Sequence, residues 1–109
     1  MNGIHTVAFS PDGKRIVLAT GRDRTRVLDV ESMKELHRWE PARHCNFSPD
    51  GKKIVLATDQ GKIRILDVES GEELRVFRQM VFGGTPDHVN YVAFSADGTK
   101  IISGHSRTV

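Results

Sequence analysis

Three histidines stand at related places along the chain and are the first candidates for metal chemistry. His5, His44 and His88 each precede an apolar segment that ends in Phe-Ser. Imidazoles that meet at one edge of a fold bind metal ions such as zinc. The positions are not equivalent, however, because Thr6 takes the place that matches His44, and no cysteine or carboxylate follows at ligand spacing. We therefore expect water-exposed histidines and no metal site.

Five aspartates also recur at fixed spacing, and paired carboxylates can act as general acids and bases. Asp12, Asp50 and Asp97 each stand in a Ser-x-Asp-Gly sequence, whereas Asp29 and Asp67 each follow an apolar segment. An aspartate in such a setting bonds the backbone of its own turn, which explains the recurrence without catalysis. Nothing in the sequence brings two of these carboxylates to one cleft. We therefore predict no catalytic residues and no enzyme.

The sequence also lacks the patterns of cofactor sites and activated nucleophiles. No helix-forming segment follows Gly83-Gly84, so these glycines do not form a phosphate-binding loop. No serine stands in the Gly-x-Ser-x-Gly pattern of a nucleophile elbow. Cys45 takes the place of Val7 and Val92, which predicts a small buried apolar side chain. We therefore predict no cofactor.

Two short segments are candidates for partner binding. Arg22 and Arg24 crowd around one turn, and an arginine rim can bind phosphate or an acidic peptide. A solvated turn is the alternative, and it is the commoner meaning of such a cluster. Met80, Val81 and Phe82 are apolar residues in an insertion between two repeats. Such loops often carry recognition, but a simple spacer fits this sequence equally well.

These positions belong to an internal repeat of short segments. Its most regular part reads VAFSPDG at 7–13, CNFSPDG at 45–51 and VAFSADG at 92–98. The first two copies are 38 residues apart and the third follows after 47. The match between the first two continues without a gap, from 14–36 onto 52–74. A period near 40 residues is typical of propeller blades and of helical pairs.

Turn residues between the apolar segments favour strands over helices. Pro, Asp and Gly of Ser-Pro-Asp-Gly suit a tight turn, and the apolar residues on both sides predict a hairpin. Segments 15–20 and 53–58 are apolar at consecutive positions, so both of their faces must be covered. We expect strands at 4–9, 15–20, 25–29 and 35–39, then at 43–47, 53–58, 62–67 and 73–78, and finally at 89–94 and 99–103.

Four short antiparallel strands per repeat, with covered inner strands, are typical of one propeller blade. The stretches VAFSPDGKRIVLAT, KIRILDVESGEEL and HVNYVAFSADGTKIISG resemble the WD-repeat family, and the resemblance covers essentially the whole chain. It implies an all-β fold of β-propeller blades with four antiparallel strands each, in an incomplete propeller of about two and a half blades. The expected divisions are blade 1 at 1–40, blade 2 at 41–78, an inter-blade insertion loop at 79–88 and a partial blade 3 at 89–109.

The sequence departs from the family pattern in its polar residues. Leu28 and Leu66 stand where the family has the Trp of its Trp-Asp pair, and the Gly-His pair before the first strand is missing. Thr20 and Thr58 stand where a serine would complete a buried His–Ser–Asp–Trp hydrogen-bond network. We therefore expect this network to be absent, which leaves apolar stacking to stabilise the blades.

Composition excludes several classes of protein. The chain has 109 residues, a formal net charge of +2 and one cysteine. The near balance of charge does not indicate nucleic acid or an anionic membrane as a partner. The longest apolar run, Ile16–Ala19, is far shorter than the roughly 20 residues of a membrane helix, and the first residues lack the pattern of a signal peptide. A lone cysteine suits a reducing compartment, and we expect a cytoplasmic protein.

The resemblance implies a protein–protein interaction or scaffold module without catalytic activity. It does not identify the ligand, because one such fold hosts many functions. The expected partners are other proteins, and self-association or further blades of a longer chain would cover the open blade faces. An alternative is a purely structural fragment or a protomer that completes a larger propeller. A third is an enzyme or sensor that uses a propeller rim.

Overall fold

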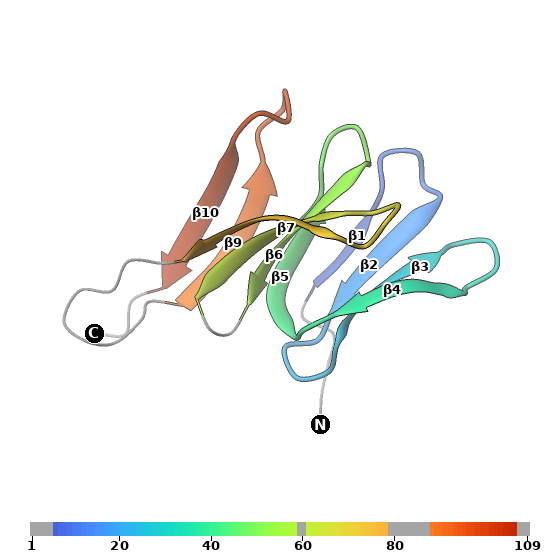
Figure 1. Cartoon of the computed structure of the whole chain (residues 1–109), viewed down its shortest axis with the longest axis horizontal. Helices are drawn as coiled ribbons and strands as arrows, with labels where there is room; N and C mark the ends of the chain where they lie inside the picture. The colour runs from blue at the N-terminus through green and yellow to red at the C-terminus, as the bar shows by residue number, and fades with distance from the viewer. Residues whose placement is uncertain (1–5, 59–60, 79–87, 107–109) are drawn as a thin grey trace.

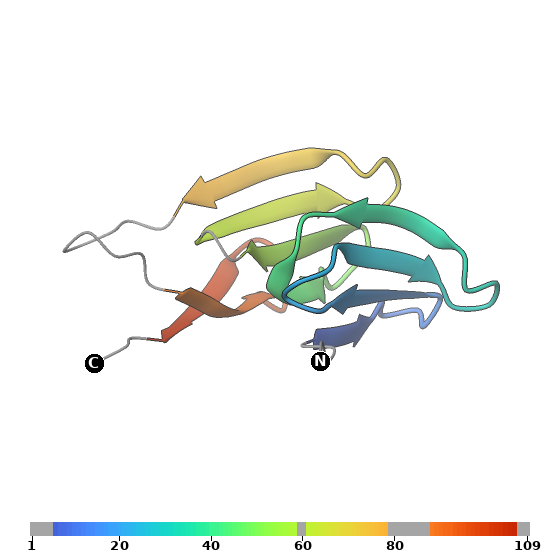
Figure 2. The same cartoon turned by 90° about the horizontal axis from the view of Figure 1, so that it is seen from below.

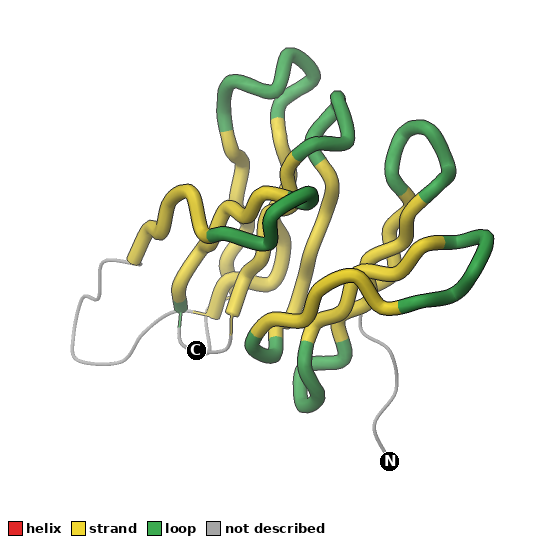
Figure 3. Tube along the Cα trace, turned by 45° about the vertical axis from the view of Figure 1, so that its right-hand side comes forward, coloured by secondary structure: helices red, strands yellow, loops and turns green. Residues whose placement is uncertain are grey.

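The computed structural model of the chain describes residues 6–58, 61–78 and 88–106, and every regular element in them is a β-strand (Figures 1 and 3). The strands form three antiparallel sheets, one for each copy of the repeat. The first blade holds β1 (Thr6–Phe9), β2 (Arg15–Ala19), β3 (Thr25–Asp29) and β4 (Glu35–Trp39); the second holds β5 (Ala42–Phe47), β6 (Lys53–Thr58), β7 (Lys62–Asp67) and β8 (Glu73–Arg78); the third holds β9 (His88–Phe94) and β10 (Ile101–Ser106). The prediction of all-β propeller blades is therefore confirmed.

Each blade is a simple meander, because strands that follow one another in the chain pair with one another. Figure 2 shows the first two blades with β1 and β5 at one edge and β4 and β8 at the other. In the third blade, β9 packs against the inner strands β5 and β6 of the second blade. No described strand of the third blade extends outward past β10.

The predicted strands agree with the observed ones, and the largest difference is at β10. We expected this strand at 99–103, but it runs from Ile101 to Ser106. The Asp97 carboxylate accepts hydrogen bonds from the Thr99 backbone N–H at 3.0 Å and from the Thr99 hydroxyl at 2.7 Å. These bonds hold Thr99 in the turn, so the strand begins later. Residues 4–5 of the first predicted strand lie outside the described residues.

The Ser-x-Asp-Gly turns have the same hydrogen bonds in all three blades. In the first, the Ser10 hydroxyl donates to the Asp12 carboxylate at 2.6 Å, and Lys14 N–H donates to the same carboxylate at 2.9 Å. Gly13 closes the turn with a φ of 72°, a conformation that glycine adopts without strain. The aspartates thus serve their own hairpins, as the sequence predicted.

The inner strand β6 is covered on both faces, as its consecutive apolar residues predicted. Ile54 and Leu56 belong to a buried cluster shared with the first blade. Val55 and Ala57 belong to a second cluster that includes Val92 of the third blade. All four of these β6 side chains are fully buried. Apolar stacking of one blade on the next is therefore the core of the protein.

The first blade has an open apolar face. Cys45 and Phe47, on the matching face of the second blade, are 0% and 6% exposed because the first blade covers them. Their counterparts Val7 and Phe9 are 46% and 60% exposed. The sequence predicted this pattern, since in the described chain no blade precedes the first.

Candidate functional site

The arginines proposed for partner binding lie in the turn between β2 and β3. Arg22 and Arg24 are both exposed. The turn is held by Thr20, whose hydroxyl oxygen accepts a hydrogen bond from the Asp23 N–H at 2.8 Å. The exposed guanidinium groups are available to an anionic partner, and this arrangement fits a solvated turn as well. Met80, Val81 and Phe82 lie outside the described residues.

The expectation of water-exposed histidines is wrong for His44, which is partly buried between two blades. His44 Nδ1 accepts a hydrogen bond from the backbone N–H of Val92 at 3.2 Å, which ties β5 to β9. Burial lowers the pKa of His44, because a charged imidazolium loses its hydration there. His5 lies outside the described residues. Across residues 6–58, 61–78 and 88–106, no three His, Cys, Asp or Glu side chains are placed to hold a metal ion.

The other candidate chemical groups are tied into the fold. Hydrogen bonds from Ser95 and Thr99 lower the pKa of the Asp97 carboxyl to about 2, so this group stays ionised and is a poor proton donor. Asp12 and Asp50 have lowered pKa values for the same reason, a bond from the serine two residues before. Burial raises the pKa of the Cys45 thiol to about 12, so it is inert as a nucleophile at neutral pH.

Two polar contacts between the blades were not found by sequence reasoning. Trp39 Nε1–H donates to the carbonyl of Gly71 at 3.1 Å, and His37 Nε2 lies 3.0 Å from the carbonyl of Glu69. Both carbonyls belong to the turn between β7 and β8. Strand β4 of the first blade is therefore tied to the last turn of the second. The acceptors are backbone carbonyls of a tight turn on the neighbouring blade. The repeat pattern predicts strands and turns but gives no signal for hydrogen bonds between blades.

A partly buried ion cluster also joins the first two blades. Arg64 Nη1 lies 2.6 Å from the Glu40 carboxylate, and Arg64 Nε lies 2.5 Å from that of Glu73. The Arg64 side chain is 18% exposed. Its counterpart in the first blade, Arg26, is 48% exposed and lies 3.5 Å from Glu35. The matching arginines thus have different surroundings, because Glu40 lies in the link between the two blades.

The described residues expose apolar faces, charged turns and a small polar cleft of about 290 Å³, which is lined by Glu40, Lys62, Arg64, Glu73 and Val76. The open face of Val7 and Phe9 offers large apolar side chains to another sheet. Arg22 and Arg24 add positive charge at a different edge of the same blade. Exposed apolar faces and charged turns are features that many protein–protein interfaces share. No helix in the described residues is long and apolar enough to cross a membrane.

Comparison with solved structures supports the propeller fold. A chain of the Kuenenia stuttgartiensis hydrazine synthase matches 92% of this chain with a TM-score of 0.74 and 20% sequence identity. The match spans 29% of that chain, so this protein corresponds to a small part of it. At this identity the similarity concerns the fold. No curated protein matches the sequence.

Family comparison identifies the repeats. The family described as "Anaphase-promoting complex subunit 4 WD40 domain" matches residues 40–82. The family described as "WD domain, G-beta repeat" matches residues 1–25 and 76–109, which together make up more than half of the chain. These matches agree with the four-stranded blades and with the spacing of the repeat. The chain belongs to the WD40 repeat family.

Proposed function

We propose that this protein is a scaffold that binds other proteins and has no catalytic activity of its own. WD40 repeats generally mediate protein–protein interactions. The described residues offer rigid stacked sheets, exposed turns and open apolar faces. Their aspartates and Cys45 are occupied by structural roles, which leaves no assembled acid, base or nucleophile among them. The lone buried thiol is compatible with the cytoplasm as its compartment.

The exposed face of Val7 and Phe9 is the observation that carries this proposal. In the second blade the same positions are covered by the preceding blade. We infer that another WD-type blade, from a second copy of this chain, packs on Val7 and Phe9 in the same manner. Val7 and Phe9 are already about half buried, so burying the rest of one such side chain stabilises a complex by about 1 kcal/mol before the entropy of association is set against it.

Sedimentation velocity of the 109-residue chain at micromolar concentration tests this inference. The wild type is expected to associate, and Phe9→Asp is expected to shift it toward the monomer. Leu36→Asp is the matched control, because Leu36 is 39% exposed on another strand of the same blade. Circular dichroism of each variant shows that the sheet is retained. A compact wild-type monomer that binds no hydrophobic dye would contradict the proposal.

Specific recognition is assigned to Met80, Val81 and Phe82 and to Arg22 and Arg24. The apolar insertion would contact a partner by burial, and the arginines would pair with its anionic groups. Replacing both arginines with glutamate should weaken binding to an acidic partner and make the remaining binding less sensitive to salt.

The alternative is a purely structural role, as part of a larger propeller. The open face of the first blade favours it, because a closed ring covers every blade on both sides. As a fragment of a longer propeller, the wild-type chain would bind a hydrophobic dye but would not form defined oligomers. As a protomer that completes a larger propeller, it would form closed oligomers of defined size. The sedimentation and dye measurements together separate the fragment from a self-associating chain, and binding of an unrelated partner protein separates the scaffold from the protomer.

A further inference from the structure

Two arginines lie side by side on the outer strands of the first blade. Arg26 of β3 and Arg38 of β4 are directly opposite one another in the strand pairing. Like charges at such positions repel and destabilise a sheet. The equivalent pair in the second blade is Arg64 and Val76, which carries one charge instead of two. The first blade therefore has a second cation where the repeat elsewhere has an apolar residue.

A single glutamate holds both of these arginines. One carboxylate oxygen of Glu35 lies 3.5 Å from Arg26 Nε, and the other accepts a hydrogen bond from Arg38 Nε at 2.8 Å. The two arginine side chains are 48% and 56% exposed. No other acidic side chain among the described residues pairs with either of them. One carboxylate thus serves two guanidinium groups, which leaves one positive charge in excess.

The second blade shows what an arginine at this position binds in addition. Arg64 Nε lies 2.5 Å from Glu73, the counterpart of Glu35, and Arg64 Nη1 lies 2.6 Å from Glu40. Glu40 belongs to the link after β4, outside the sheet that holds Arg64. This arginine therefore takes one carboxylate from its own blade and a second one from elsewhere. Arg26 has the first of these and, within the described residues, lacks the second.

The position of Arg38 is accessible even where two blades pack together. Its counterpart Val76 is 45% exposed and lines the polar cleft of about 290 Å³ at the junction of the first two blades. Lys62 lines the same cleft, and its counterpart Arg24 is exposed. A ligand can therefore reach Arg38 and Arg24 whether or not a further blade covers the first one.

We propose that Arg26 and Arg38 bind a carboxylate-rich segment of a partner protein. One carboxylate of the partner pairs with both guanidinium groups and offsets the repulsion between them. The carboxylate is chosen because Glu40 occupies the matching place at Arg64. The assignment rests on the proposed scaffold function and names the chemistry of one partner. It adds two strand residues to the arginines of the β2–β3 turn.

The test uses the full chain and a fluorescent peptide of consecutive glutamates. We expect saturable binding by fluorescence anisotropy at low salt, and no binding of the same peptide made with glutamine. Arg38→Val copies the second blade and should weaken binding by at least about fivefold. Arg75→Val is the matched control, because Arg75 is an exposed cation on β8 that lies opposite Ile65 instead of an arginine. It removes the same charge and should leave the affinity nearly unchanged.

Thermal unfolding separates a binding role from a structural one. Arg38→Val removes the repulsion with Arg26 and leaves Glu35 to that arginine alone, as Glu73 is left to Arg64 in the second blade. The Tm of the free variant should therefore equal or exceed that of the wild type, although the variant binds the peptide less tightly. A clear fall in Tm would mean that Arg38 and Glu35 form a structural ion pair, and it would overturn the proposal.

Amide chemical shifts measured by NMR locate the bound peptide. Changes are expected in β3 and β4, and larger changes in any other strand would overturn the assignment. Absence of binding, or equal weakening by Arg38→Val and Arg75→Val, would overturn it too. If inorganic phosphate displaces the peptide at a lower concentration than glutarate does, the site prefers phosphate and the carboxylate assignment is wrong. Self-association that still depends on Phe9 would leave the scaffold proposal standing, so the two failures are distinguishable.

Discussion

The indole of Trp39 donates a hydrogen bond to the carbonyl of Gly71, 32 residues further along the chain and on the next blade. Trp39 is 7% exposed, so both the ring and its N–H are removed from water. Buried donors need a partner, and this bond supplies one while it fixes the turn of the second blade against the first. The contact is a polar link between blades in addition to their apolar stacking.

Replacing Trp39 with Phe should lower the free energy of unfolding by about 1–3 kcal/mol. The variant loses the hydrogen bond from the indole N–H, so the Gly71 carbonyl has no donor from residue 39. The smaller ring also leaves a small cavity. Urea denaturation followed by circular dichroism measures the change. The matched control is Phe77→Leu in the second blade, which is expected to shift stability by only about 0.5 kcal/mol because Phe77 is 42% exposed, against 7% for Trp39. Equal losses in the two variants would contradict the role assigned to Trp39.

Met33 adopts a φ of 60°, whereas its counterpart Gly71 has a φ of 77°. A side chain is strained in this left-handed region, and glycine is not. Met33→Gly should therefore raise the unfolding free energy by up to about 1 kcal/mol, after the entropy of glycine in the unfolded chain is subtracted. Met33→Ala keeps the strain and should give no comparable gain. A gain from alanine equal to that from glycine would show that the methionine side chain, and not its backbone, is unfavourable.

The reverse substitution, Gly71→Ala, should destabilise the chain more strongly than the Met33 change stabilises it. A Cβ at position 71 would lie 2.6 Å from His37 Nδ1, and it would also be strained by the positive φ. The loss should therefore exceed about 1 kcal/mol in thermal or urea unfolding. Gly13→Ala has a similar φ but open space around the added Cβ, so the difference between the two variants measures the clash with His37.

His44 should make stability depend on pH below neutrality. Its pKa in the folded protein is lowered from 6.5 by burial, so the unfolded chain takes up the proton first. The unfolding free energy is therefore highest above pH 6.5 and falls as pH decreases toward the folded pKa. Denaturation at pH 7.5 and pH 5.0 measures the difference. His44→Asn retains an acceptor for Val92 N–H without titrating in this range, and it should reduce the pH dependence. If the variant keeps the pH dependence of the unfolding free energy, other titrating groups cause it.

Arg64 should tolerate replacement less well than its counterpart Arg26. Lysine cannot bind Glu40 and Glu73 through two separate nitrogens, so Arg64→Lys should lower the unfolding free energy by about 1–2 kcal/mol. Arg26→Lys affects a more exposed pair and should change it by less than about 1 kcal/mol. Added salt should weaken both effects. Similar losses in the two variants would mean that the Glu40 link between the blades contributes little.

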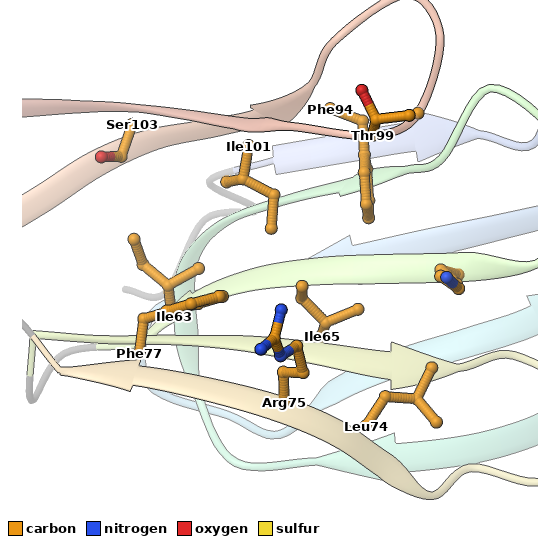
Figure 4. Close-up of a pocket in the computed structure, with 11 residues that line it drawn as sticks. Ile63, Ile65, Leu74, Arg75, Phe77, Phe94, Thr99, Ile101 and Ser103 are labelled. Atoms are coloured by element: carbon orange, nitrogen blue, oxygen red, sulfur yellow. The ribbon is translucent and has the colours of Figure 1, made fainter.

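The repeat in the sequence determined the strands but not the contacts between blades. Turn chemistry at Ser10–Gly13 and the apolar pairs of β6 are local signals, which explains why strand positions could be predicted. The different surroundings of Arg64 and Arg26 could not be predicted from the sequence. They depend on Glu40, the residue between the first two blades that lies beside Arg64. A groove of about 360 Å³ between the second and third blades, with Phe77, Phe94 and Ile101 among its lining residues, was missed for a related reason (Figure 4). It follows from comparing one blade interface with the next, and such a comparison needs coordinates.

The meander of each blade has a consequence for how the chain folds. All strand pairs join neighbours in sequence, so the hydrogen bonds of a blade close short loops, whereas the contacts between blades are made largely by side chains. Hairpins can therefore form early and independently, and docking of blades comes later. The second blade, which is covered on both faces, should be the last to open, and hydrogen exchange should spread inward from the two outer blades.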